Sequence, residues 1–172
     1  MTPKVNAEAE FAYGAGHLNP VNATNPGLVY DAQYIDYIEF LCGQGYSTEN
    51  LRLVTGDQIN CSDVRKTAAS HLNYPSFALL IKSQRLATCI YRRTVTNVGL
   101  SVSTYKAVIQ APSGLKVRVY PTTLSFSSLG QKISFTVRVE VESDEKMLSG
   151  SLTWDDGLHL VRSPIVAYHL PS

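Results

Sequence analysis

Residues Ile133 to Val141 have the sequence ISFTVRVEV, in which apolar and polar side chains alternate without a break. Successive side chains of a β-strand point to opposite faces of a sheet, so Phe135 and its apolar neighbours share one face and the polar residues share the other. A helix would scatter the same valines around its circumference. The segment therefore predicts a strand in a sheet that has one buried and one solvated face.

Short runs of the same kind fill the rest of the chain beyond residue 72, and turn residues separate them. Asp156-Gly157 lies between two apolar runs and predicts a hairpin, because the favoured two-residue turn needs positive φ at both positions. The number and spacing of the runs are typical of a β-sandwich. The expected strands are Phe77–Ile81, Ile90–Val98, Tyr105–Gln110, Lys116–Tyr120, Thr123–Phe126, Ile133–Val141, Leu148–Trp154 and Leu158–Tyr168.

The half of the chain before residue 70 has a different character. Apolar residues recur at spacings of three and four between Asp31 and Gly43, which predicts an amphipathic helix with Asp31 as its N-cap. A second short helix is expected from Thr48 to Val54, with Leu51 and Val54 facing inward. The polar, aperiodic stretch from residue 59 to residue 70 predicts a surface loop and a domain boundary.

Four segments carry a resemblance to a known family. They are FAYGAGHLNPVNATNPGLVYD at Phe11 to Asp31, LNYPSF at Leu72 to Phe77, RTVTNVG at Arg93 to Gly99, and TWDDGLHLVRSPI at Thr153 to Ile165. Over nearly its whole length the chain resembles the C-terminal region of plant subtilisin-like serine proteases, the cucumisin-like group.

This resemblance implies a mainly β fold in two parts. Residues 71–172 would form an immunoglobulin- or fibronectin-III-like β-sandwich. Residues 1–70 would be a small helical and loop remnant, the tail of an α/β subtilisin catalytic domain. The family's Gly-Thr-Ser nucleophile motif does not occur here, and neither do its Asp, His and oxyanion-hole motifs. No catalytic residue is therefore expected, and the segment would begin after the catalytic serine of the parent enzyme.

The function that the resemblance implies is that of the C-terminal region of a secreted serine endopeptidase, which braces the catalytic domain. The expected partner is that domain, and polypeptide substrate would be met only through it. The residues expected at the domain contact are Tyr13, Gly14, Gly16, His17, Asn19, Pro20, Pro26, Gly27 and Tyr30. A stand-alone binding or protease-masking module is the alternative, and an independent hydrolase has little support.

Composition excludes several other classes of function. The formal net charge is +1 with 17% charged residues, which lacks the basic excess of a nucleic-acid-binding protein. No apolar window approaches the roughly 18 residues of a membrane span, and residues 1–6 lack the apolar core of a signal peptide. The four histidines form no metal-ligand pair, so no metal or other cofactor is expected. Extracellular or apoplastic localisation is expected for the parent protein.

Three cysteines and two N-glycosylation sequons are relevant to the expected extracellular localisation. A Cys42–Cys61 disulfide would close a loop of some 20 residues and stabilise it by about 3 kcal/mol. Alternatively, the cysteines are small buried apolar residues, which is the expected role of Cys89. Asn22 and Asn60 each begin an N-glycosylation sequon, and Asn60 is the better candidate because Asn22 lies in a tight, proline-rich segment.

Overall fold

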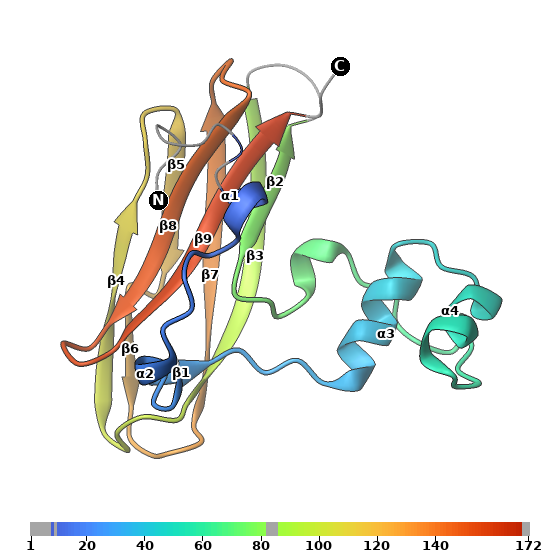
Figure 1. The fold of residues 1–172 in the computed structure, drawn as a ribbon, viewed down its shortest axis with the longest axis horizontal. Helices are drawn as coiled ribbons and strands as arrows, with labels where there is room; N and C mark the ends of the chain where they lie inside the picture. The colour runs from blue at the N-terminus through green and yellow to red at the C-terminus, as the bar shows by residue number, and fades with distance from the viewer. Residues whose placement is uncertain (1–7, 9, 82–85, 170–172) are drawn as a thin grey trace.

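Two β-sheets stack face to face in the computed structural model of the chain, which describes residues 8, 10–81 and 86–169 (Figure 1). The first sheet has the order β1 (Leu28–Val29), β3 (Leu86–Asn97), β7 (Lys132–Glu142) and β5 (Leu115–Tyr120). The second has the order β2 (Phe77–Ile81), β9 (Leu160–His169), β8 (Met147–Asp155), β4 (Ser103–Gln110) and β6 (Thr123–Phe126). Neighbouring strands are antiparallel except β2 and β9, which are parallel. The predicted β-sandwich is confirmed.

The side chains of β7 explain why the sheets stack. Phe135, Val137, Val139 and Val141 are all buried, and the residues between them are polar. The facing sheet contributes Trp154, which has no exposed surface and packs edge-on against Phe135 with ring centroids 5.0 Å apart. The tryptophan therefore belongs to the core between the two sheets.

Strand β1 was not expected from the sequence. It lies inside the segment Phe11 to Asp31, and it pairs Leu28 with Asn97 and Val29 with Thr96 of β3. The Leu28 side chain is buried in the sandwich core. Two residues are too few to show an alternating pattern, so only the tertiary contacts define this strand. The N-terminal segment is therefore attached to the sandwich itself.

Short helices precede and follow β1. They are α1 (Glu10–Tyr13), α2 (Pro20–Ala23), α3 (Tyr34–Gly43), α4 (Thr48–Thr55) and the 3₁₀ helix η1 (Ala69–His71). The prediction that Asp31 caps α3 is wrong, because the helix begins later and Gln33 is the N-cap. The Asp31 carboxylate instead accepts a hydrogen bond from Thr96 and pairs with Lys132 Nζ at 3.1 Å.

Helices α3 and α4 form a lobe that projects from the side of the sandwich (Figure 1). A disulfide joins Cys42 to Cys61, and these two residues pack with Ile38 and Leu51 to make the small core of the lobe. Leu51 faces inward as predicted, but the same prediction for Val54 is wrong, because 64% of its surface is exposed. Among the described residues, no helix has the length and apolar character needed to cross a bilayer.

The two adjacent arginines of β3 lie on opposite faces, as alternation requires, with Arg92 exposed and Arg93 buried. The buried Arg93 is bound by backbone carbonyls. Its guanidinium donates to the backbone carbonyls of Ser70, Tyr74 and Ser76 at 2.7, 2.9 and 3.3 Å. It also lies over the Phe77 ring, 5.0 Å from the centroid. Arg93 of β3 thus supplies hydrogen-bond donors to carbonyls within residues 70–76, the segment that begins in η1 and leads into β2.

Residues 1–6, on which the expectation about a signal peptide depends, lie outside the described residues.

Candidate docking surface at one end of the sandwich

A hollow of about 840 Å³ opens at one end of the sandwich, between the N-terminal segment and two loops. The loops are the β3–β4 connection and the β8–β9 hairpin, which are far apart in the sequence. The lining residues are Val21, Asn22, Asn25, Pro26, Leu28, Gly99, Leu100, Leu158, His159, Leu160, Val161 and Arg162. The surface is therefore composite, and no single segment of the sequence defines it.

Two glycines bring the N-terminal segment against the β3–β4 loop. The amides of Val98 and Gly99 both donate to the Gly27 carbonyl, at 2.9 and 3.0 Å. Gly27 has φ +76°, and a Cβ built on it would lie 2.7 Å from His159 Cγ and 2.7 Å from Tyr105 Oη. The positive φ disfavours a residue with a side chain, and His159 and Tyr105 leave no room for a Cβ. Glycine is therefore required at position 27.

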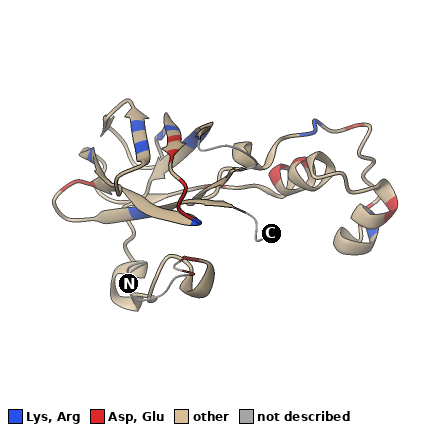
Figure 2. Ribbon diagram, turned by 90° about the horizontal axis from the view of Figure 1, so that it is seen from above, with Lys and Arg blue, Asp and Glu red and all other residues tan. Residues whose placement is uncertain are grey.

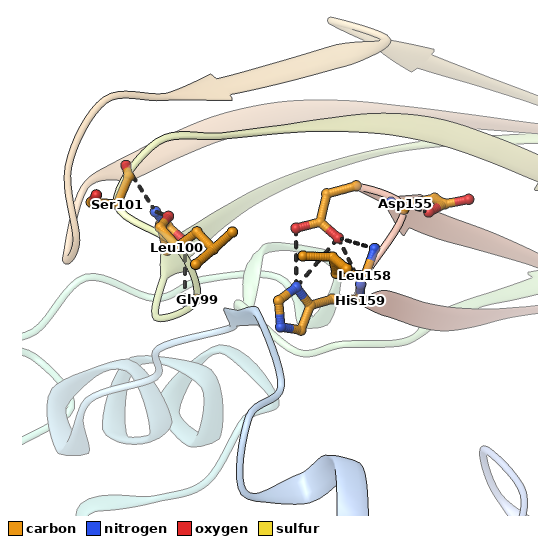
Figure 3. A network of polar contacts seen from close by, with 9 residues as sticks. Gly99, Leu100, Ser101, Asp155, Leu158 and His159 are labelled. Carbon is orange, nitrogen blue, oxygen red and sulfur yellow. Dashed lines mark hydrogen bonds and ion pairs between the residues drawn. The ribbon is translucent and has the colours of Figure 1, made fainter.

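His159 lines the hollow beside Gly99 (Figure 3), and its ring is hydrogen-bonded to Asp156. His159 Nδ1 lies 3.0 Å from Asp156 Oδ2, and the side chains are only 10% and 5% exposed. This contact is part-buried although it lies in a surface turn. His159 Nδ1 also lies 3.3 Å from Asp156 Oδ1.

The same carboxylate closes the β8–β9 hairpin. Asp156 Oδ1 accepts hydrogen bonds from the amides of Leu158 and His159 at 2.9 and 2.6 Å. Burial raises the pKa of the Asp156 carboxyl, but the bonds from His159 and from the two amides outweigh it and lower the pKa to about 2. The connecting loop has four residues, 156–159, where the sequence predicted two, because these side-chain bonds hold a longer turn.

The β3–β4 loop carries Gly99 and Leu100 to the hollow (Figure 3), and Asn97 fixes its shape. It is fully buried, and its amide nitrogen donates to the Leu100 carbonyl at 2.7 Å while its oxygen accepts from the Gly99 amide at 3.1 Å. These bonds turn the backbone so that the Leu100 side chain faces solvent. The loop is thus fixed by a side chain of the adjacent strand.

Four apolar side chains surround the hollow, and we refer to them as the apolar rim. Leu100, Leu158, Leu160 and Val21 are 55%, 75%, 73% and 80% exposed. Exposed apolar side chains that gather beside a hollow mark a surface for contact with another protein. The rim has the character of a docking surface.

The structure places only part of the predicted domain contact at this hollow. Tyr30 packs against Phe135 and its hydroxyl lies 3.0 Å from Ser163 Oγ, so it serves the sandwich, as Gly27 does. Pro26 lines the hollow and Tyr13 is half-buried, whereas the remaining predicted residues are exposed. Those exposed residues are Gly14, Gly16, His17, Asn19 and Pro20. Their contact with another domain remains a prediction.

Sequence reasoning missed the apolar rim, because its four residues come from α2, the β3–β4 connection, the β8–β9 hairpin and the start of β9, which are far apart in the sequence. A signal was present, since the segments RTVTNVG and TWDDGLHLVRSPI both contain these turns. Nothing in either segment showed that they meet.

The predicted modification sites lie on the surface. Asn22 is in α2 at the edge of the hollow, and Asn60 is exposed beside the disulfide, with its oxygen accepting from Thr48 Oγ1 at 2.7 Å. Their glycosylation remains a prediction. Cys89 is half-buried and free. Within the described part of the chain, no cluster of His, Cys, Asp or Glu could hold a metal ion.

The strand order, the buried sandwich core and the loop-lined end define an all-β domain of the fibronectin class. The family model of the fibronectin type-III domain matches residues 71–167, and the chain belongs to this family.

The curated relatives specify the kind of protein in which the domain occurs. The chain is 47% identical over 170 residues to Subtilisin-like protease SBT4.6 of Arabidopsis thaliana and 49% identical over 164 residues to SBT4.8 of the same plant. These alignments cover 97% and 92% of this chain but 23% of each relative, so the chain spans about a quarter of their length. The matched part is their C-terminal part, which confirms the resemblance to subtilisin-like proteases.

Solved structures add nothing to the assignment. A FixG-related protein from Vibrio parahaemolyticus aligns with 52% of this chain and 100% of its own, at 8% identity and a TM-score of 0.37. Similarity at this level carries no argument about function.

Proposed function

We propose that the chain is the C-terminal region of a secreted subtilisin-like serine endopeptidase and that it braces the catalytic domain. The catalytic domain would supply the Asp, His and Ser groups and bind the polypeptide substrate. This chain would supply a docking surface and no reacting group. The observation that carries the proposal is the apolar rim, which stands exposed on a chain that spans a quarter of the length of its protease relatives.

The proposed mechanism of bracing rests on rigidity. The Gly27 carbonyl is bonded to two amides of the β3–β4 loop, and the Asp156 carboxylate closes the β8–β9 hairpin. The three segments that form the hollow are therefore held by hydrogen bonds before any partner arrives. A preorganised surface loses little conformational entropy on docking, so more of the apolar contact energy stabilises the assembled enzyme.

Within this proposal, residues 1–70 belong to the tail of the catalytic domain and residues 71–172 to the fibronectin-type-III-like domain. Strand β1 pairs with β3 across that division. The N-terminal part would then connect the two domains by being hydrogen-bonded into the sheet of one and covalently continuous with the other.

Extracellular localisation is also part of the proposal. The Cys42–Cys61 disulfide favours an oxidising compartment, and two exposed sequons are compatible with passage through the secretory pathway.

The test uses the longer protein in which this segment lies. The double substitution Leu100→Asn and Leu158→Asn should reduce the yield of active protease severalfold, because the rim would no longer be complementary to an apolar partner. The control is Leu86→Asn, which changes a leucine of comparable exposure, 67%, at the start of β3 and away from the hollow. Equal yields from the double variant and the parent would refute docking through the rim.

A separate measurement addresses the alternative. Mass mapping of the native product, with an antibody against residues 125–142, shows whether these residues occur in a long or a short protein. A native product of residues 1–172 alone would favour a non-catalytic binding or masking module. A product several times larger would support the protease assignment.

A further inference from the structure

The outer face of the first sheet carries a group of basic side chains that the proposed function does not use. The strand register aligns three rows across β3, β7 and β5. They are Arg92, Thr136 and Tyr120, then Ile90, Arg138 and Arg118, then Thr88, Glu140 and Lys116. We call these nine positions the basic grid, because they hold four cations and one acid. Figure 2 shows Lys and Arg positions along this side of the sandwich, opposite the side on which the N-terminal helices lie.

The centre of the basic grid breaks a rule of sheet pairing. Arg118 and Arg138 are directly opposite each other on neighbouring strands, and like charges in that position destabilise a sheet. A single carboxylate serves both arginines, since Glu140 lies 2.8 Å from Arg138 Nη2 and 3.4 Å from Arg118 Nη1. Locally unfavourable pairings of this kind tend to occur at functional sites.

The exposed fractions of these side chains determine which charges a ligand can contact. The Glu140 side chain is 19% exposed, whereas Arg138 and Arg118 are 48% and 69% exposed. The Glu140 carboxylate is therefore less accessible to solvent than the two guanidinium groups that contact it. Arg92 is also exposed, and Lys116 makes only a solvent-exposed pair with Glu142 at 3.5 Å, which contributes little. The surface therefore presents positive charge.

Tyr120 adds an aromatic ring to the same face. It is 80% exposed and follows Arg118 by two residues on β5, so both side chains point to the same side of the sheet. An exposed ring beside guanidinium groups offers a flat apolar platform next to anion-binding donors.

We propose that the basic grid binds an acidic polysaccharide. Carboxylate groups along the chain would accept hydrogen bonds from Arg92 and Arg118, whose planar forks match a carboxylate. Arg138 would contribute through Nη1, because its Nε and Nη2 already contact Glu140 at 2.9 and 2.8 Å. A sugar ring would stack on Tyr120. A neutral glycan would leave the arginines unused. Nucleic acid, whose anionic groups are phosphates, is the competing polyanion that the binding test includes as a probe.

This site is independent of the docking surface. The hollow lies at one end of the sandwich, and the N-terminal segment packs on the second sheet through Phe11 and Tyr168, whose ring centroids are 4.9 Å apart. The basic grid is on the outer face of the first sheet.

The binding test uses the chain of residues 1–172 and four probes: polygalacturonate, heparin, neutral dextran and single-stranded DNA. Polygalacturonate should bind, with affinity that falls as salt rises, and dextran should not. Arg118→Gln with Arg138→Gln should weaken polygalacturonate binding by about tenfold, since two charge-assisted contacts are lost. Arg65→Gln with Lys66→Gln is the control, because it removes the same charge from an exposed loop of the helical lobe and should change affinity less than about twofold.

Two further variants keep the proposal falsifiable if the double variant fails to fold. Glu140→Gln removes the only acid of the grid and should strengthen polygalacturonate binding by about threefold. Tyr120→Ala should weaken binding of polygalacturonate while leaving DNA binding, if any, as weak as before. Absence of polygalacturonate binding, equal losses in the two charge-matched double variants, or binding of DNA as tight as that of polygalacturonate would each overturn the proposal.

Discussion

Arg93 is the residue on which the segment between the lobe and the sandwich most depends. Replacing it with Met would leave the carbonyls of Ser70, Tyr74 and Ser76 without donors, so we expect the free energy of unfolding to fall by about 3 kcal/mol. Urea unfolding followed by the fluorescence of Trp154, the only tryptophan, measures this.

The adjacent residue provides the control for Arg93. Arg92→Met removes the same charge from the exposed face of the same strand and should change stability by less than about 0.5 kcal/mol. Similar losses in the two variants would contradict the role assigned to the buried guanidinium.

Gly27 combines a backbone requirement with a steric one. Gly27→Ala must place a Cβ 2.7 Å from His159 and from Tyr105 at positive φ, and we expect it to destabilise the chain by about 3 kcal/mol or more. Gly45→Ala measures the cost of a side chain at positive φ alone, because Gly45 has φ +90° and no atom within 4 Å of its Cβ position. That variant should lose only about 1 to 2 kcal/mol. Thermal unfolding of both variants decides whether the close approach matters.

The low pKa of Asp156 predicts a dependence of stability on pH. The folded pKa of about 2 lies below the ordinary value of 3.8, so the ionised carboxylate stabilises the fold above pH 3.8 and this contribution is lost as the pH falls toward 2. A difference of nearly two units corresponds to about 2 kcal/mol. Asp156→Asn should therefore flatten the stability curve between pH 4 and pH 2 in urea titrations.

A variant of the adjacent carboxylate separates this effect from the charge of the turn. If Asp155→Asn flattens the curve as much as Asp156→Asn does, the stabilisation does not come from the Asp156 hydrogen bonds.

At the scale of elements, the α3–α4 lobe should unfold independently of the sandwich. Its core consists of Ile38, Leu51 and the two bridged cysteines, which is too small to hold two helices without the disulfide. Cys42→Ala with Cys61→Ala should remove about 3 kcal/mol of local stability and expose the lobe to protease. Cys89→Ala, which changes the one free cysteine, should leave the cleavage pattern unaltered.

Amide hydrogen exchange distinguishes local from global loss in the lobe variant. Protection should vanish in α3 and α4 and persist in β7 and β8, which lie in the sandwich. Loss of protection throughout the chain would show that the lobe and the sandwich unfold as one unit.

The elements that the sequence predicted well are those whose pattern is local. Strand β7 alternates over a full strand length, and the predicted strand differs from the observed one by a single residue at each end. The start of α3 was misplaced, because Asp31 has two tertiary partners, Thr96 and Lys132, that compete with a capping role. Strand β1 was missed because two residues carry no periodicity.

At the scale of the whole molecule, the candidate docking surface was beyond reach from sequence for a different reason. Its parts include the β3–β4 connection, which passes from one sheet to the other, and the β8–β9 hairpin, and only the fold brings Gly99 and His159 to the same end of the sandwich. The residues predicted for the domain contact all came from one continuous segment, so they include Pro26, which lines the hollow, but not Leu100 or Leu158. A surface built from segments that are distant in the sequence can be predicted only after the topology of the fold is known.

The two proposed surfaces lie on different faces, and this makes their effects separable in the longer protein. The apolar rim would act through buried apolar contact, which salt weakens little, whereas the basic grid would act through exposed charges that salt screens. Leu100→Asn with Leu158→Asn should therefore reduce the yield of active protease and leave polygalacturonate binding within about twofold. Arg118→Gln with Arg138→Gln should do the opposite, and 0.5 M salt should reproduce only the second effect. Coupled losses in both assays would mean that the two surfaces serve one partner, because independent sites on a rigid sandwich have additive effects.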